Sequence, residues 1–143
     1  AEKWLYPIAP YATQQWILEL KNWFHKHREE LEHWPARRCL IHGDLGTQHL
    51  IFDPTAGLVK GVIDFGFAGI GDPAIDLAAV ISQLGESQLQ KMKPWYPELD
   101  DLLFRARLWS LSTPLWWAIQ GIRTGDRSWL LAGLHTARDI RLE

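Results

Sequence analysis

The chain lacks several features that would assign it at once to a membrane or secreted class. It holds one cysteine, Cys39, among 143 residues, so an internal disulfide is excluded, which fits a reducing compartment. No apolar run approaches the roughly 18 residues of a membrane span. The first residues also lack the basic start and apolar stretch of an export signal. The sequence therefore predicts a cytoplasmic protein with no membrane partner.

An excess of one charge is missing as well. The chain has 15 Lys and Arg against 17 Asp and Glu, a formal net charge of −2, and no run of basic residues. Nucleic acid is therefore not expected as a partner. With 47% hydrophobic and 22% charged residues, the composition is that of a globular domain, and its length predicts a single domain over residues 1–143 with one core.

Periodic patterns predict a mostly α-helical α+β fold. Apolar residues at three- and four-residue spacing predict helices, short apolar runs predict strands, and Pro54–Gly57 between two runs predicts a hairpin turn. Asp72 followed by Pro73 predicts a helix cap with proline in the first turn. Gly121 and Gly125 are expected in the turn between the last two helices. The expected helices are 11–33, 73–84, 99–120 and 126–141, and the expected strands are 38–42, 50–53 and 58–64.

One further absence concerns phosphate binding. No glycine-rich phosphate loop followed by a strand lysine occurs in the sequence, and 37 residues precede the first expected strand. Transfer of a phosphoryl group needs one acid near the acceptor and another on the metal. Asp44 in a loop and Asp64 after the second hairpin strand meet that need, because both lie at the open end of one hairpin. His49 lies where the loop enters the hairpin and can turn toward the same metal.

Four motifs follow one another in order: His42–Asp44, the five-residue interval from Asp44 to His49, Ile63–Gly66, and Asp72–Ala78. Over residues 39–80 they resemble the aminoglycoside phosphotransferase and choline kinase-like family, relatives of the protein kinases. The resemblance implies the C-terminal lobe of a kinase-like fold. It also implies ATP and Mg²⁺ as cofactors, and a small-molecule hydroxyl acceptor such as an aminoglycoside, a macrolide or choline.

The resemblance also implies roles for five residues. Asp44 would be the catalytic base, and Asp64 and His49 would bind Mg²⁺. His42 and Asp76 would support the catalytic loop, His42 by bracing it and Asp76 by accepting hydrogen bonds from its backbone. Residues that bind the nucleotide are not identified.

Two departures from the family pattern matter. His49 stands where the family usually has Asn, and imidazole is a softer ligand than the oxygen donors that Mg²⁺ prefers. His49 is therefore either a metal ligand or a loop residue bonded to backbone, and Gln48 is an alternative oxygen donor. The family's N-terminal lobe is not found, so this chain alone is expected to be inactive and to associate with itself through the uncovered surface.

Other functions remain open. A non-catalytic kinase-like lobe, acting as a binding or regulatory module, is the main alternative. A metal hydrolase that uses Asp44, His49 and Asp64 is a weaker one, because such enzymes need a denser set of ligands.

The acceptor is not identified by the sequence. The tryptophans at 109, 116, 117 and 129 either stack on an acceptor or pack between helices. The acids at 98, 100 and 101 either attract an amine or complement the helix dipole.

Overall fold

The computed structural model describes residues 5–29 and 38–140. The chain divides into two compact units: unit 1 comprises residues 1–35 and 111–143, and unit 2 comprises residues 36–110. The single-domain organisation over residues 1–143 stays a prediction. The expectation of one core is wrong, because the buried apolar residues that the structure describes form two separate clusters, one in each unit. The mostly helical fold with small antiparallel sheets is confirmed. The helices are α1 (Gln14–Lys26), α3 (Ala74–Leu84), α4 (Glu86–Gln90), α5 (Leu99–Thr124) and α6 (Arg127–Asp139), and the strands are β1 (Cys39–Ile41), β2 (Leu50–Asp53), β3 (Leu58–Val62) and β4 (Gly69–Gly71).

Unit 1 is built on helix packing. Leu5, Ile8 and Leu20 are almost fully buried and share a core with the second half of α5 and with α6. Removing such a side chain from water stabilises the fold by roughly 1.5–3 kcal/mol. Helix α1 begins at Gln14, three residues later than expected. The hydroxyl oxygen of Thr13, the cap residue, accepts the Trp16 N–H.

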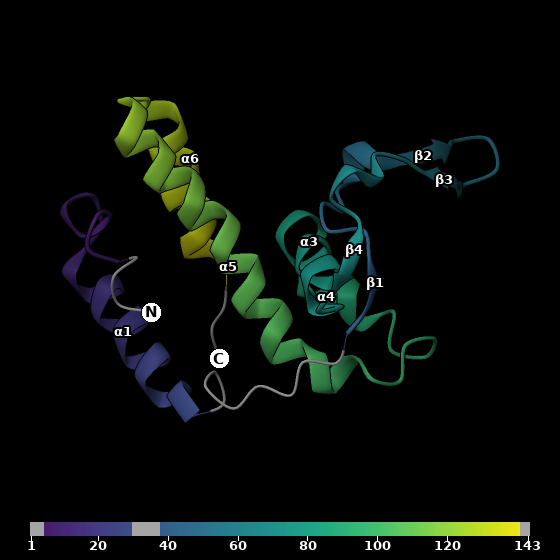
Figure 1. Ribbon diagram of the computed structural model, residues 1–143, viewed down its shortest axis with the longest axis horizontal. Coiled ribbons are helices and arrows are strands. Elements are labelled where there is room, and N and C mark those ends of the chain that lie inside the picture. Colours follow the sequence, from purple (N-terminus) through teal and green to yellow (C-terminus); the bar gives the residue numbers. More distant parts are fainter. Residues whose placement is uncertain (1–4, 30–37, 141–143) are drawn as a thin grey trace. The chain divides into compact units, whose positions relative to one another are not determined.

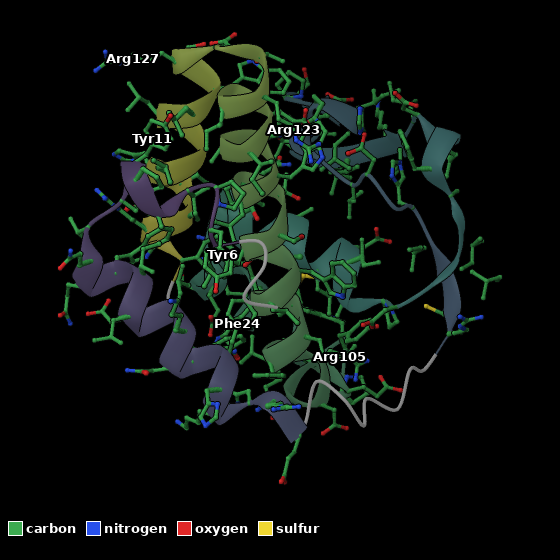
Figure 2. All side chains as sticks on the ribbon, turned by 60° about the vertical axis from the view of Figure 1, so that its left-hand side comes forward. Tyr6, Tyr11, Phe24, Arg105, Arg123 and Arg127 are labelled. Carbon is green, nitrogen blue, oxygen red and sulfur yellow. The ribbon has the colours of Figure 1, made fainter. Side chains whose placement is uncertain are left out.

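The end of α1 also differs from the prediction. A turn at His27 follows α1, residues 28 and 29 are helical again, and the expected continuation to residue 33 lies outside the described residues. At the other end of unit 1, α6 begins where Asp126 Oδ1 accepts the N–H groups of Ser128 and Trp129. Figure 2 shows Arg123 and Arg127 near the turn that joins α5 to α6. The expected last residue of α6, Arg141, lies outside the described residues.

Two glycines explain how closely α5 and α6 pack in unit 1. A Cβ on Gly133 would lie 2.4 Å from the Pro114 carbonyl oxygen, and one on Gly121 would lie 2.3 Å from the Leu130 nitrogen. The prediction that Gly121 lies in a turn is wrong, because it lies inside α5 where the backbone of α6 approaches. Gly125, with a φ of +74°, follows the end of α5, as predicted for a helix terminator.

Unit 2 packs α3, α4 and the first half of α5 around a second core, which includes Leu77, Leu89, Leu99 and Leu102. Helix α3 ends at Gly85, with a φ of +85°. The predicted helix is confirmed over Ala74–Leu84, but the predicted cap is one residue off, because Pro73 lies at the cap position and Asp72 precedes it. Asp72 still accepts the Ala74 N–H at 3.1 Å, so its side chain satisfies one of the free amides at the helix start.

The strands of unit 2 form two separate antiparallel pairs. Strands β2 and β3 make the predicted hairpin, with Leu50 opposite Val62, and the hairpin extends away from α3 and α4 (Figure 1). Strand β1 pairs with β4, which was not predicted because its Gly-Ile-Gly sequence carries little strand preference. The strand predicted over 38–42 is present as β1 over 39–41, but an apolar sequence did not ensure burial, since Leu40 is 75% exposed.

Large apolar side chains lie exposed on the strands of unit 2 and on the turn after β3. They are Leu40, Ile51, Phe52, Leu58, Val59, Val62, Ile63, Phe65, Phe67 and Ile70. We refer to this set as the exposed apolar residues of unit 2. Among the described helices, none is both long enough and apolar enough to cross a membrane.

Candidate functional site

The loop between β1 and β2 is fixed by one carboxylate of α3. The backbone N–H groups of His42 and Gly43 donate to Asp76 Oδ2 and Oδ1, at 2.7 and 2.9 Å. A carboxylate that accepts two backbone donors holds both peptide planes, and hydrogen bonds to a charged acceptor are stronger than neutral ones. This is the contact expected of Asp76, while its part in a reaction stays a prediction.

His42 joins the loop to the end of the hairpin. Its side chain is buried, and Nε2 lies 2.9 Å from the carbonyl oxygen of Ile63. A carbonyl oxygen only accepts, so Nε2 carries the proton, and Nδ1 is left to accept the Asp44 N–H at 3.4 Å. The ring also lies against Phe65, with 4.8 Å between the centroids. His42 therefore ties the residue before Asp64 to the residues around Asp44.

Gly43 makes the sharp turn that precedes Asp44. Its φ is +81°, and a Cβ there would lie 2.4 Å from the carbonyl oxygen of Phe67. Both the backbone conformation and the available space therefore require glycine. The same turn brings the Phe65–Phe67 segment, a short 3₁₀ helix (η4), against the loop.

His49 lies between the two acids of the site. Residues Thr47–His49 form a short 3₁₀ helix (η3) that leads into β2. His49 Nδ1 lies 2.7 Å from the Asp44 carbonyl oxygen, which requires the proton on Nδ1. The other ring nitrogen, Nε2, lies 3.6 Å from Asp64 Oδ2, and it carries a lone pair when the ring is neutral. Two electron-pair donors that face each other at this distance suit a shared cation.

Asp64 has an unusual backbone. Its φ of 64° and ψ of 60° place it in the left-handed region, and it is the one non-glycine residue with positive φ in the part of the chain that the structure describes. Asp tolerates this conformation better than most residues, but it still costs of order 1 kcal/mol. The carboxylate is 61% exposed. Strain of this kind often persists where a side chain must be aimed at a ligand.

Asp44 differs from the other acids of the site. It is exposed, and among the described residues its carboxylate accepts no hydrogen bond, whereas its N–H and carbonyl are both engaged by His42 and His49. The backbone is therefore held while the side chain stays available. A carboxylate in this state can accept a proton from a bound hydroxyl group.

The ligand set for a metal is small. Within residues 5–29 and 38–140, no group of three His, Cys, Asp or Glu side chains is placed to hold a metal ion. His49 and Asp64 supply one nitrogen and one carboxylate, which fits Mg²⁺ only where water and substrate phosphate complete the coordination. Gln48, the alternative donor, has its side-chain amide beside the backbone of Gly46.

A second cluster, which the sequence did not predict, lies at the start of α3. Arg105 on α5 (labelled in Figure 2) binds both carboxylate oxygens of Asp72, at 3.2 and 3.1 Å, and each side chain is 11% exposed. Trp109 adds its indole N–H to Asp72 at 3.3 Å. Asp72 is thus an ion-pair partner as well as the acceptor of the Ala74 N–H. Sequence reasoning missed Arg105 because 33 residues separate it from Asp72.

The tryptophans and acids that the sequence offered as contacts for the acceptor lie in both units. In unit 1, Trp116 and Trp129 form a pair with 6.2 Å between ring centroids and are each 46% exposed. In unit 2, Trp109 is engaged by Asp72. Lys93 binds Asp100 at 2.6 Å, which reduces the free negative charge at the start of α5.

Solved structures with a similar fold are phosphotransferases. The GDP complex of wild-type aminoglycoside 2'-phosphotransferase-IIIa matches with a TM-score of 0.80 at 22% identity, over 95% of this chain and 48% of that one. Macrolide 2'-phosphotransferase type I matches with a TM-score of 0.59 at 27% identity, over 79% of this chain and 40% of that one. The fold is therefore the kinase-like fold of the aminoglycoside phosphotransferases.

The chain belongs to the phosphotransferase enzyme family, whose model matches residues 2–117. A curated relative, viomycin phosphotransferase from Streptomyces vinaceus, is 40% identical over 56 residues, which is 38% of this chain and 20% of that protein. The chain thus spans about half the length of the solved structures it resembles, and its match to the curated relative covers a fifth of that protein. The resemblance to this family inferred from the motifs is confirmed.

Proposed function

We propose that this chain is the catalytic and acceptor-binding lobe of a nucleotide-dependent kinase that phosphorylates a hydroxyl group of a small molecule. Membership of the phosphotransferase family supports the reaction class. The observation that carries the proposal is local: the available carboxylate of Asp44 lies on a loop whose His49 faces Asp64 at 3.6 Å. One acid for the acceptor and one for the metal are the parts that phosphoryl transfer requires.

In this proposal each residue has a separate task. Asp44 orients the acceptor hydroxyl and takes its proton as the oxygen attacks phosphorus. Asp64 and His49 would hold Mg²⁺, which neutralises charge on the nucleotide phosphates. His42 and Asp76 keep the loop in shape through the contacts described above. ATP is the proposed phosphate donor, and similar solved structures contain GDP or ADP.

The acceptor class follows only from relatives. Their names specify aminoglycosides, a macrolide and viomycin, so a hydroxylated antibiotic is the first class to test, with choline-like amino alcohols as the next.

The test is calorimetric titration of this chain with ATP and with GTP, with and without Mg²⁺. Asp64→Asn removes one charge at the site and keeps the shape and the tolerance of left-handed backbone. Asp53→Asn is the matched control, because Asp53 lies at the far end of the same hairpin, where it binds Thr55 N–H and the Lys60 ammonium group.

Two outcomes decide the proposal. Magnesium-dependent binding that weakens at least tenfold in Asp64→Asn and not in Asp53→Asn supports it. Calorimetric titration with a panel of hydroxylated antibiotics then identifies the acceptor class by binding, because this chain alone is expected to be inactive. Binding that is equal in all three proteins, or independent of magnesium, contradicts the metal role of Asp64.

A second candidate function has one observation in its favour. The exposed apolar residues of unit 2 are ten large side chains, which suit a kinase-like module that binds a protein or a second copy of itself. Light scattering at rising concentration tests self-association: a constant monomer mass contradicts it. Nucleotide binding as described above favours the kinase over the module.

A further inference from the structure

Helix α3 contacts the site loop at a second point, through Gln83, a residue that lies outside the four motifs. The Thr47 N–H donates to the side-chain oxygen of Gln83 at 2.7 Å. Thr47 opens the η3 turn, and the first amides of a helical turn have no acceptor within the turn itself. Gln83 therefore supplies the acceptor that this turn lacks.

The spacing of the two contacts makes α3 a rigid support for the loop. Asp76 and Gln83 are seven residues apart, so they share one face of the helix about 10 Å from each other. Their partners Gly43 and Thr47 are four residues apart, and four residues span at most roughly 14 Å. The loop that carries Asp44 is thus held at both of its ends by one helix.

The contact at Thr47 affects the position of His49, which faces Asp64. The η3 turn ends in His49, whose N–H donates to the Gly46 carbonyl at 2.9 Å. His49 in turn bonds the Asp44 carbonyl and faces Asp64. Release of Thr47 would loosen the turn and so the direction in which the His49 ring points.

We infer that Gln83 is a positioning residue, which holds the η3 turn so that His49 and Asp44 keep their place relative to Asp64. Gln83 itself touches neither acid. It is exposed, as is Thr47, so its loss should leave the two cores intact and affect the loop alone. The structural part of this inference stands on the Thr47 contact, and its effect on nucleotide binding rests on the proposed function.

The test compares three variants of the full chain. Gln83→Met keeps the length of the side chain and removes the acceptor, whereas Gln83→Glu keeps an acceptor oxygen. Gln88→Met is the matched control. Gln88 lies on α4 and is also exposed, and its side-chain oxygen also accepts one hydrogen bond, from the Lys91 ammonium group at 2.9 Å. Amide hydrogen exchange by NMR reads the Thr47 N–H directly, and thermal unfolding reads the global stability.

Gln83→Met should speed the exchange of the Thr47 amide about fivefold, the effect of one lost neutral hydrogen bond. Gln83→Glu should restore slow exchange, and Gln88→Met should leave Thr47 unchanged. The unfolding temperature should stay the same in all three. Unchanged exchange in Gln83→Met, or equal acceleration in Gln83→Glu, would overturn the inference.

Magnesium–ATP titration of the same variants separates this inference from the proposed function. Weaker binding in Gln83→Met, recovered in Gln83→Glu, supports both. If the unsubstituted chain binds no nucleotide, the proposed function fails while the exchange of Thr47 still decides the role of Gln83. If binding is present and Gln83→Met alters neither binding nor exchange, the inference fails and the proposed function stands.

Discussion

The two units hold their backbones in place by different means. In unit 1, α5 and α6 are in direct contact through Gly121 and Gly133, and buried aliphatic side chains surround that contact. In unit 2, the loop that carries Asp44 is held by side chains that accept its amides, Asp76 and Gln83. Close apolar packing tolerates no added volume, whereas a hydrogen-bonded loop can change locally.

Because of this difference, substitutions in unit 1 should mainly change the free energy of unfolding, whereas substitutions at the loop of unit 2 should mainly change the candidate site. A substitution in the α5–α6 contact should act on the folding of unit 1, because the neighbouring atoms are backbone and cannot move aside. A substitution at the loop should change the site with a smaller effect on unfolding. The predictions below test this contrast, from the largest expected effect to the smallest.

Gly133→Ala should have the largest effect. Its Cβ would lie 2.4 Å from the Pro114 carbonyl oxygen and 2.5 Å from the Ala118 nitrogen, so the two helices must separate, at a cost of about 3 kcal/mol. Urea unfolding measures the loss. Gly69→Ala is the control, since nothing lies within 4 Å of the added atom, and an equal loss in both variants would contradict the close packing of α5 on α6.

Asp76→Ala should cost about 2 kcal/mol, because the N–H groups of His42 and Gly43 lose a charged acceptor. Asp76→Asn keeps one acceptor oxygen, so it should lose less. Unfolding in urea gives the free energy, and amide exchange at His42 shows whether the loop opens before the unit unfolds. Slow exchange at His42 in Asp76→Ala would mean that the loop is held without this residue.

Asp64 allows the strain of the site to be measured. The test compares Asp64→Gly with Asp64→Ala. In the left-handed region Ala is less favourable than Gly by about 1 kcal/mol, so Asp64→Gly should have the higher free energy of unfolding by that amount. Both should lose magnesium-dependent nucleotide binding, because both lack the carboxylate. Equal free energies of unfolding would show that the chain does not hold this residue at positive φ in solution.

The smallest effect is expected at the cap of α6, where it depends on pH. The Ser128 hydroxyl and then the Trp129 N–H lower the pKa of Asp126 below its model-peptide value of 3.8. A carboxyl group with a lowered folded pKa stabilises above the unfolded pKa and loses this contribution as pH falls through the folded one. Asp126→Asn should therefore unfold at a slightly lower temperature at pH 7. The difference should vanish well below pH 3.8, and a difference that persists there would contradict the assigned cause.

Local signals in the sequence predicted much of unit 2. The hairpin was predicted because Pro54–Gly57 is a turn sequence between two apolar runs, and α3 because Asp72 and Pro73 form a start signal. The set of His42, Asp44, His49, Asp64 and Asp76 was identified from ordered motifs, and the structure brings them together within unit 2. Contacts between distant residues were missed, including the pairing of β1 with β4 and the binding of Arg105 to Asp72.

The sequence by itself determined the family and the mostly helical class and predicted the site residues, because these depend on residue type and on short intervals along the chain. Only the tertiary structure decided that Gly121 lies within a helix, that Leu40 is exposed and that Gln83 bonds the loop. Each of these depends on which backbone comes close in space. That proximity is set by the packing of whole elements, and the local pattern at any one residue does not encode it.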